Sequence, residues 1–246
     1  MSPRIVLTLA LALWFSLLAL TASADPSLYE PFEASGPAAT TTASYWGSTG
    51  LLLTPTAMVE RPLKFSAFWH EVNTDPSNQT FIGLSVGLPF GFEVSGVRMQ
   101  DLPPLPATPE SFRDETILNA KYQVPLGPIV GNPLAPKVAI GVIDANNDFN
   151  RVIYVAASRS FTLTQQSNAA LNVHLGWGNS NHGDARLDGF FGGVDLAPVP
   201  SVLLQAEYDA KNLNAGVRWY PRSWGSIDLG VVGNGFAWGA TLRSDF

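Results

Sequence analysis

The feature that most constrains this chain is a two-residue alternation between apolar side chains and small or polar ones. Because successive side chains of a β-strand point to opposite faces, such a segment has one apolar and one polar face. In the C-terminal stretch FAWGATLRSDF, one parity holds Phe236, Trp238, Ala240, Leu242, Ser244 and Phe246, and the other holds Ala237, Gly239, Thr241, Arg243 and Asp245. The pattern recurs, strongly or weakly, in residues 63–69, 81–88, 92–99, 116–124, 137–144, 151–161, 171–178, 187–196, 202–209, 213–220, 226–232 and 236–246. The sequence therefore predicts an all-β protein of about twelve strands.

Alternation alone fits two architectures, a soluble β-sandwich and a transmembrane β-barrel. Charged residues make up only 14% of the chain, against about 25% in a typical soluble domain. The polar faces are rich in glycine, serine and asparagine, which suit a narrow lumen. Aromatic residues near segment ends, where lipid–water interfaces would place them, are Trp69, Tyr122, Trp177, Tyr208, Trp219 and Trp238. We therefore predict an antiparallel up-and-down transmembrane β-barrel in the bacterial outer membrane, surrounded by outer-membrane lipid.

The N-terminal region has the features of an export signal. Arg4 provides a positive charge, residues 5–20 form an apolar run, and Ala22-Ser23-Ala24 matches a small-x-small cleavage site. We expect cleavage between Ala24 and Asp25, which would remove residues 1–24 as a signal peptide.

The mature chain divides into two regions. Residues 25–48 are rich in proline, alanine, serine and threonine and have no period, so we expect a flexible segment. Residues 49–246 would form the barrel domain, with residues 49–62 as either a lumen plug or the first strand. The connections alternate between compact, mostly proline-marked turns and polar loops, which matches the periplasmic and extracellular ends of a barrel.

Composition and spacing give little sign of catalysis or metal binding. The chain has no cysteine, which excludes disulfides and thiolate sites, and its net charge of −6 is unsuited to nucleic acid. The histidines, His70, His174 and His182, lack the close spacing of zinc ligands. The stretch DANNDFNRV, from Asp144, lacks the glycine and glutamate of a calcium loop, so we expect a plain polar turn. We expect no enzyme, no cofactor, no metal site and no nucleic-acid partner.

A set of ionisable side chains falls on the polar faces, which a barrel would turn into its lumen. A lysine or arginine facing lipid would cost roughly 2–4 kcal/mol near the membrane midplane, so inward placement is favoured. The candidates are Lys64, His70, Lys121, His174, Asp195, Glu207, Arg218, Asp228 and Arg243. They would either brace a narrow interior as ion pairs or form a polar track for a hydrophilic ligand such as a sugar chain. A hairpin turning at Lys211 and Asn212 would place Glu207 opposite Gly216, with Arg218 diagonal to it, and we expect Glu207 and Arg218 to pair.

Two stretches resemble the YjbH-like family of outer-membrane proteins. The first, GLLLTPTAMVERPLKFSAF from Gly50, is similar to the family's opening G-L-x-x-T-P-T-A segment. The second, FFGGVDLAPVPSVLLQAEYDAKNLNAGVRWYP from Phe190, is similar to a later hairpin with G-V-D/E, A-E-Y-D and N-x-G-x-R-Y-P elements. The resemblance implies a β-barrel associated with exopolysaccharide production and its passage through or retention at the outer membrane. It also implies polysaccharide or polysaccharide-export proteins as partners, although this chain has room for a single barrel.

Other functions fit parts of the same pattern. A small passive pore or a purely structural barrel needs no ligand, and steady single-channel conductance would favour the pore. A secreted soluble β-sandwich that binds sugars would be recognised by membrane fractionation. A lipid hydrolase carried on a barrel would need a catalytic histidine, for which His174 is the candidate.

The last residue carries a prediction about assembly. A terminal phenylalanine on the final strand resembles the signal that the barrel assembly machinery reads, so we expect that machinery as a partner. Deleting Phe246 should reduce the amount of folded protein in the outer membrane of cells, while refolding into detergent should change much less. The heat-modifiable band on electrophoresis measures both. Normal outer-membrane levels of the truncated chain would show that Phe246 is not an assembly signal.

Overall fold

A computed structural model describes residues 42–74, 77–102, 113–126, 136–164, 169–181 and 186–244. The predicted signal peptide, its cleavage site between Ala24 and Asp25, His182 and Phe246 lie outside these residues. Within the described ranges, no helix is both long and apolar enough to cross a membrane.

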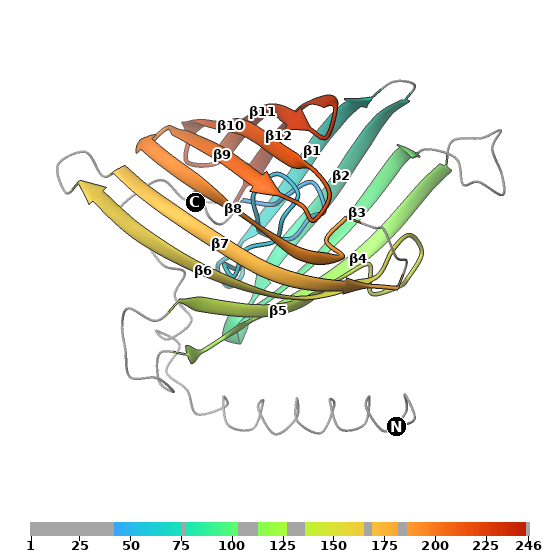
Figure 1. Cartoon of the computed structure of the whole chain (residues 1–246), viewed down its shortest axis with the longest axis horizontal. Helices are drawn as coiled ribbons and strands as arrows, with labels where there is room; N and C mark the ends of the chain where they lie inside the picture. Colours follow the sequence, from blue (N-terminus) through green and yellow to red (C-terminus); the bar gives the residue numbers. More distant parts are fainter. Residues whose placement is uncertain are drawn as a thin grey trace.

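Twelve antiparallel strands form one closed sheet (Figure 1). They are β1 (Phe65–Thr74), β2 (Ser77–Leu88), β3 (Phe92–Leu102), β4 (Arg113–Val124), β5 (Lys137–Ile143), β6 (Val152–Thr164), β7 (Ala169–Ser180), β8 (Gly189–Val199), β9 (Val202–Tyr208), β10 (Leu213–Arg222), β11 (Gly225–Val232) and β12 (Gly235–Arg243). A short 3-10 helix, η3 (Pro89–Gly91), links β2 to β3. Consecutive strands pair, and β1 also pairs with β12 from Ser66↔Arg243 to Asn73↔Phe236. The predicted up-and-down barrel is confirmed, and the soluble sandwich, which needs two separate sheets, is disfavoured.

The exterior of the barrel is apolar. Along β12 the exposed Phe236 and Trp238 alternate with inward residues such as Arg243, as the parity predicts. Every strand leaves at least one large apolar side chain exposed, with Phe190 at 79% and Leu175 at 67% among the highest. A continuous apolar surface of this kind is unfavourable in water but matches the lipid-facing band of a membrane barrel. The chain is therefore an outer-membrane β-barrel.

The two ends of the barrel differ in their connections. The end at which β1 begins and β12 finishes carries η3 and the tight turns after β8 and β10. It also carries one longer connection, residues 125–136 after β4. The other end carries three longer connections, after β3, β5 and β7, and the short turns after β1, β9 and β11. Because short turns face the periplasm in outer-membrane barrels, these ends are called the periplasmic and extracellular rims below.

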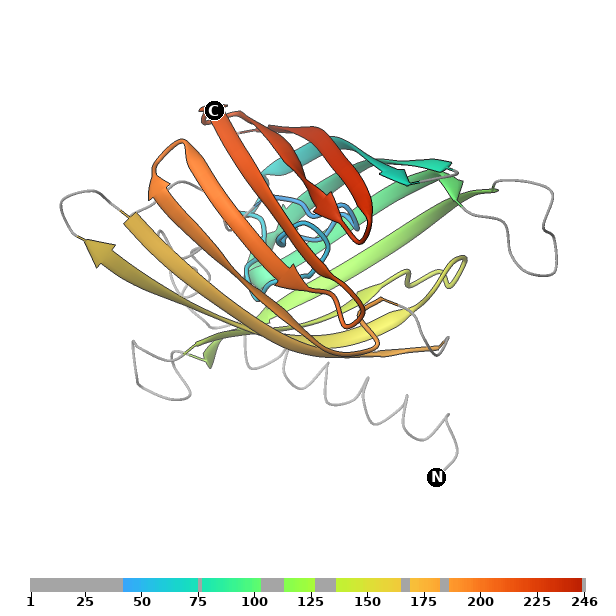
Figure 2. The same cartoon turned by 45° about the horizontal axis from the view of Figure 1, so that its top comes forward.

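Residues 42–62, called the plug, lie inside the barrel rather than forming its first strand (Figures 1 and 2). The plug is an irregular loop with two isolated bridges within it, Ala43↔Thr49 and Gly50↔Pro55, and a third to β2, Pro62↔Gly87, and nearly all of it is buried. Glycines in the wall make room for it: a Cβ at Gly216 would lie 3.1 Å from the side chain of Leu52. The expected boundary at residue 48 is wrong, because residues 42–48 belong to the packed plug and not to a flexible segment.

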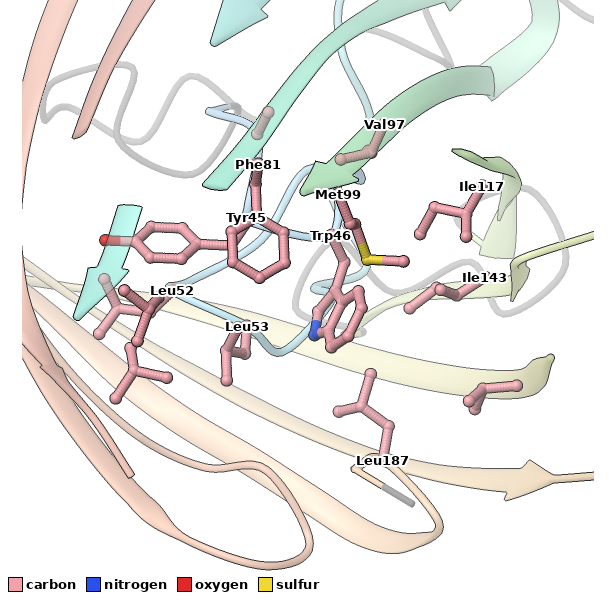
Figure 3. Packing of buried hydrophobic residues seen from close by; sticks show 14 of the residues in the cluster. Tyr45, Trp46, Leu52, Leu53, Phe81, Val97, Met99, Ile117, Ile143 and Leu187 are labelled. Atoms are coloured by element: carbon pink, nitrogen blue, oxygen red, sulfur yellow. The ribbon is translucent and has the colours of Figure 1, made fainter. Parts of the chain in front are cut away.

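The lumen is not uniformly polar, as the alternation pattern alone suggests. On the extracellular side, Trp46 of the plug belongs to an apolar cluster with Phe81, Met99 and Ile117 of the wall (Figure 3). Phe149, from the connection after β5, packs against this cluster, and its ring centroid lies 5.9 Å from that of Trp46. These inward apolar side chains are buried because the plug supplies partners that strand periodicity cannot reveal.

Gly83 of β2 should not tolerate a side chain. A Cβ at this position would lie 2.3 Å from the Phe68 ring and 2.6 Å from the carbonyl oxygen of Gly96. We expect Gly83→Ala to destabilise the barrel by roughly 1–3 kcal/mol through overpacking, measured as a lower temperature at which the heat-modifiable band converts. Gly96→Ala is the control, because its Cβ would meet only Leu118, at 3.5 Å. Equal effects of the two substitutions would contradict the prediction.

Candidate functional site: the plug and its anchors

The first anchor of the plug is Glu93 on β3, which is buried beside Lys121 of β4. Glu93 Oε1 accepts a hydrogen bond from the Thr49 N–H at 2.8 Å, and Oε2 accepts one from the Glu60 N–H at 2.7 Å and another from the Thr49 hydroxyl. Lys121 Nζ lies 3.3 Å from Glu93 Oε1 and donates to the Thr49 carbonyl at 2.8 Å. This ion pair therefore satisfies backbone groups at two separate points of an irregular segment, which strand pairing cannot do.

The second anchor is Glu207 on β9. Its carboxylate accepts hydrogen bonds from the N–H groups of Leu53 and Thr54, at 2.9 and 3.0 Å, and from the Thr54 hydroxyl at 2.9 Å. Asn214 Nδ2 on the neighbouring strand donates a fourth, at 3.0 Å. A buried carboxylate is costly unless it is well hydrogen-bonded, and three of these four donors come from the plug.

The predicted pairing of Glu207 with Arg218 is wrong. Glu207 lies opposite Asn214 rather than opposite Gly216. Arg218 is therefore four residues, not two, from the β10 position opposite Glu207, and it is not a diagonal neighbour of Glu207. Arg218 Nε instead donates to Asp228 Oδ1 on the other neighbouring strand, where the two residues are direct register partners.

The cause of this shift lies in the turn between the two strands. The Asp209 carboxylate accepts the N–H groups of Lys211 and Asn212, at 3.0 and 2.7 Å, and the Asp209 N–H donates to the Asn212 carbonyl. An aspartate that bonds to amides two and three residues later closes a tight turn. The hairpin therefore closes between Asp209 and Asn212, and the whole register moves by two residues.

The third anchor is a relay of three side chains on β6, β7 and β8. Asp195 Oδ2 lies 2.8 Å from His174 Nε2, and His174 Nδ1 lies 2.8 Å from Ser158 Oγ. Ser158 Oγ accepts a hydrogen bond from the plug N–H of Ala57 at 2.9 Å, and Asn172 holds the other oxygen of Asp195. With His174 Nε2 donating to the carboxylate, His174 Nδ1 accepts a hydrogen bond from the Ser158 hydroxyl, and a lone pair of the hydroxyl oxygen is left to accept the Ala57 N–H.

The relay has the composition of a Ser-His-acid triad, but its geometry suits plug binding better than acyl transfer. Acyl transfer needs N–H donors placed for an oxyanion beside the nucleophile. The plug N–H that reaches Ser158, that of Ala57, is already bonded to the hydroxyl oxygen itself. All three side chains of the relay are at most 2% exposed.

Arg218 and Asp228 form a buried pair next to His70 and the plug. Asp228 Oδ2 lies 3.5 Å from His70 Nε2, and all three side chains are fully buried. The Tyr45 ring of the plug stacks on His70 with centroids 4.1 Å apart. The structure thus brings together three of the residues that the sequence placed in the lumen, and the plug covers them.

The remaining candidates lie near the periplasmic rim. Lys64 precedes β1 and its Nζ donates to the Ser244 carbonyl at 2.9 Å. Ser244 is buried, which corrects its predicted place on the lipid face. Arg243 faces inward near Glu60 of the plug, whose carboxylate accepts the Ser66 hydroxyl at 2.7 Å. Burial raises the pKa of Glu60, while the Ser66 hydrogen bond and Arg243 act in the opposite direction.

The stretch from Asp144 forms a polar turn. The Asp144 carboxylate accepts the N–H groups of Asp148, Phe149 and Asn150, at 3.0, 2.8 and 2.5 Å. These bonds use the oxygens that a cation would need. In the part of the chain that the structure describes, no group of three or more His, Cys, Asp or Glu is placed to hold a metal ion.

Two anchors were missed by the sequence analysis. Glu93 falls on the inward parity of a weakly alternating segment, and that parity was the signal that could have found it. Ser158 lies among small residues, and nothing in the sequence distinguishes a serine that binds the plug from one that only fills space in the lumen. A further plug contact was also missed: Asn119 Nδ2 donates to the Trp46 carbonyl at 2.6 Å, and an uncharged inward amide gave no signal of it.

Comparison with known proteins gives distant likenesses. No protein-family model and no curated protein matches the sequence. The Acinetobacter baumannii outer membrane protein Omp33 is similar with 11% identity and a TM-score of 0.41, over 74% of this chain and 100% of that one. Ail, the attachment invasion locus protein of Yersinia pestis, is similar with 10% identity and a TM-score of 0.14, over 73% of this chain and 95% of that one. The fold assignment rests on the closed sheet and its apolar exterior, not on these likenesses.

Arg218 and Asp228 should be strongly coupled. Replacing one alone, as Arg218→Met or Asp228→Asn, leaves a buried group without its partner and should cost about 3–5 kcal/mol of unfolding free energy, while the double variant recovers part of that loss. Chemical denaturation of the refolded barrel measures the cycle. The cycle of Glu207→Gln with Arg218→Met is the control and should be close to additive. Additivity between Arg218 and Asp228 would refute the pairing.

Proposed function

We propose that this protein is a gated outer-membrane conduit for a hydrophilic surface polymer, closed at rest by the plug. The observation that carries the proposal is how the plug is held. Side chains of three separate wall strands, Glu93, Glu207 and Ser158, accept backbone N–H groups of the plug. Each such hydrogen bond has a modest net value, about 0.5–3 kcal/mol, because water replaces it when it breaks. A plug held in this way can leave a lumen that water then enters.

The alternatives fit the geometry less well. A steadily open pore is at odds with a lumen that holds the plug. A purely structural barrel can fill its interior with wall side chains alone. Here the donors to Glu207 are the plug and Asn214, not a lysine or arginine. If the plug leaves, Glu207 loses three of its four donors, and water in the lumen would have to replace them. This dependence on the plug suits a barrel whose lumen is hydrated when the gate is open.

The polymer class is proposed from the family resemblance, which the arrangement of the two motif segments supports. The Leu53-Thr54 amides belong to the G-L-L-L-T-P-T-A segment, and Glu207 belongs to the A-E-Y-D element of the later hairpin. These two segments, about 150 residues apart, meet through the second anchor. Residues that look distinctive for the YjbH-like family thus form one contact, which would hold the plug in its closed position. We extend the proposal to exopolysaccharide as the polymer.

On this proposal the protein is not an enzyme and needs no cofactor. Its partners would be outer-membrane lipid, the barrel assembly machinery, and a polysaccharide or the proteins that export it. The Ser158–His174–Asp195 relay then serves to hold the plug rather than to cleave a bond.

Planar-bilayer recordings test the gate. The intact protein should be closed for most of the time. Glu93→Gln and Glu207→Gln should each raise the open fraction roughly tenfold, which corresponds to the loss of about 1.4 kcal/mol from charge-assisted contacts. Deleting residues 48–57 should give sustained conductance. The control is Glu115→Gln, which removes a carboxylate of β4 that pairs with Arg113 and not with the plug. Steady conductance of the intact protein, or no change on deletion, would refute the gate.

The polymer is tested separately in cells. A strain lacking the gene should release or display less exopolysaccharide, and the intact gene should restore it. The Glu115→Gln gene should restore it as well. If the gate is present in bilayers but the polysaccharide level never changes, the conduit stands and exopolysaccharide is not what it carries.

A further inference from the structure

A group of buried polar side chains on the lumen face of β9 to β12 takes no part in holding the plug. Gln205, Arg218, Ser226 and Thr241 are each at most 4% exposed. Within the described residues, no hydrogen-bond partner is present for the Gln205 amide or for the hydroxyls of Ser226 and Thr241. The two terminal nitrogens of Arg218 have no partner in hydrogen-bond geometry, although the Tyr220 side chain interacts with the guanidinium. Buried polar groups are satisfied in nearly all native structures, so these groups require a partner from outside the chain.

Strand register places these groups side by side. Gln205 lies opposite Gly216 on β10, which makes it diagonal to Arg218 on the same face. On the other side of β10, Ser226 is likewise diagonal to Arg218, and it lies directly opposite Thr241 of β12. Diagonal neighbours in a sheet are about 7–8 Å apart, within reach of long side chains. The four side chains therefore form one continuous patch across four strands.

The plug forms the cover of this patch. Figure 3 shows the Tyr45 ring extending from the plug, with its hydroxyl at the tip, and no described residue is bonded to that hydroxyl. Tyr45 interacts electrostatically with both Asp228 and Arg218, which places it at the patch, and burial raises its pKa so that it remains a donor. The Tyr220 hydroxyl, near Arg218, bonds to Thr42 at 3.1 Å and closes the patch from the start of the plug.

We propose that this patch binds a small oxyanion, either a carboxylate or a phosphate group. Asp228 holds Arg218 through Nε, which leaves the two terminal nitrogens as a fork that matches two oxygens of one anion. The amide of Gln205 and the hydroxyls of Ser226 and Thr241 add further donors around it. Donors outnumber acceptors, which is unsuited to a cation. The second oxygen of Asp228 lies 3.5 Å from His70 Nε2, and no described residue donates a hydrogen bond to it.

The site lies between wall and plug, so the bound anion would link the two. This inference does not depend on polymer passage or on the identity of the polymer. It requires only that the closed barrel admits a small solute.

Thermal unfolding of the refolded mature barrel in a zwitterionic amine-oxide detergent tests the site. Sodium phosphate and sodium acetate, compared with sodium chloride at equal ionic strength, should raise the heat-modifiability midpoint in a saturable way. Gln205→Leu and Thr241→Val should each weaken the apparent affinity roughly three- to tenfold, the usual value of one hydrogen bond. Arg218→Lys should abolish the response while keeping the positive charge beside Asp228. Ser95→Ala, which removes a lumen-facing hydroxyl of β3, is the matched control and should keep the full response.

Each outcome of this experiment either supports or overturns the proposed anion site. A response to one of the two anions alone supports the site and names its ligand class. No response to either anion would mean that only water satisfies the patch, and an equal response to glucose would mean a polyol site; both results overturn the proposal. An undiminished response in Gln205→Leu and Thr241→Val would place the anion elsewhere and overturn it as well.

Discussion

Inside a membrane every backbone N–H and C=O group needs a partner within the protein, and the rest of this structure depends on that constraint. The wall meets it by closing, since the pairing of β1 with β12 leaves no free sheet edge. The plug cannot meet it in the same way, because its chain is irregular. Wall side chains therefore supply the missing acceptors, and the carboxylates of Glu93 and Glu207 accept amides that a helix or strand would have paired internally.

This arrangement divides the lumen into two environments with different consequences. On the extracellular side the plug packs through Trp46 into an apolar cluster, which favours a fixed position. Elsewhere the plug is held through polar contacts with Glu93, Glu207 and Ser158, and the patch on β9 to β12 carries unsatisfied donors near Tyr45. Breaking a polar contact costs little free energy when water takes the partner's place, whereas breaking an apolar contact exposes apolar surface to water, which is unfavourable. In the proposed gate the polar contacts are the ones that open, and the proposed anion site lies among the polar side chains of the lumen.

Much of the fold follows from local pattern. All twelve strands coincide with alternating segments of the sequence, and the parity of β12 is correct from Phe236 to Arg243. The errors arise where one distant contact decides the result. Ser244 has the parity of a lipid-facing residue but is buried beside Lys64. The Glu207–Arg218 pair fails because the Asp209 side chain closes the turn one residue earlier than expected, which shifts the pairing of the two strands by two residues. Residues 42–48 have the composition of a flexible segment, yet the barrel encloses them.

The sequence by itself determined the all-β class, the number of strands and which face of each strand meets lipid, because these depend on periodicity and on the cost of exposing charge to hydrocarbon. Only the tertiary structure decided which inward residues hold the plug, which charges pair and which donors stay unsatisfied. The physical reason is that inward parity gives a side chain a direction but not a partner. Its partner depends on strand register, on closure of the sheet and on where an irregular segment comes to rest, and each of these is set by contacts between residues far apart in the chain.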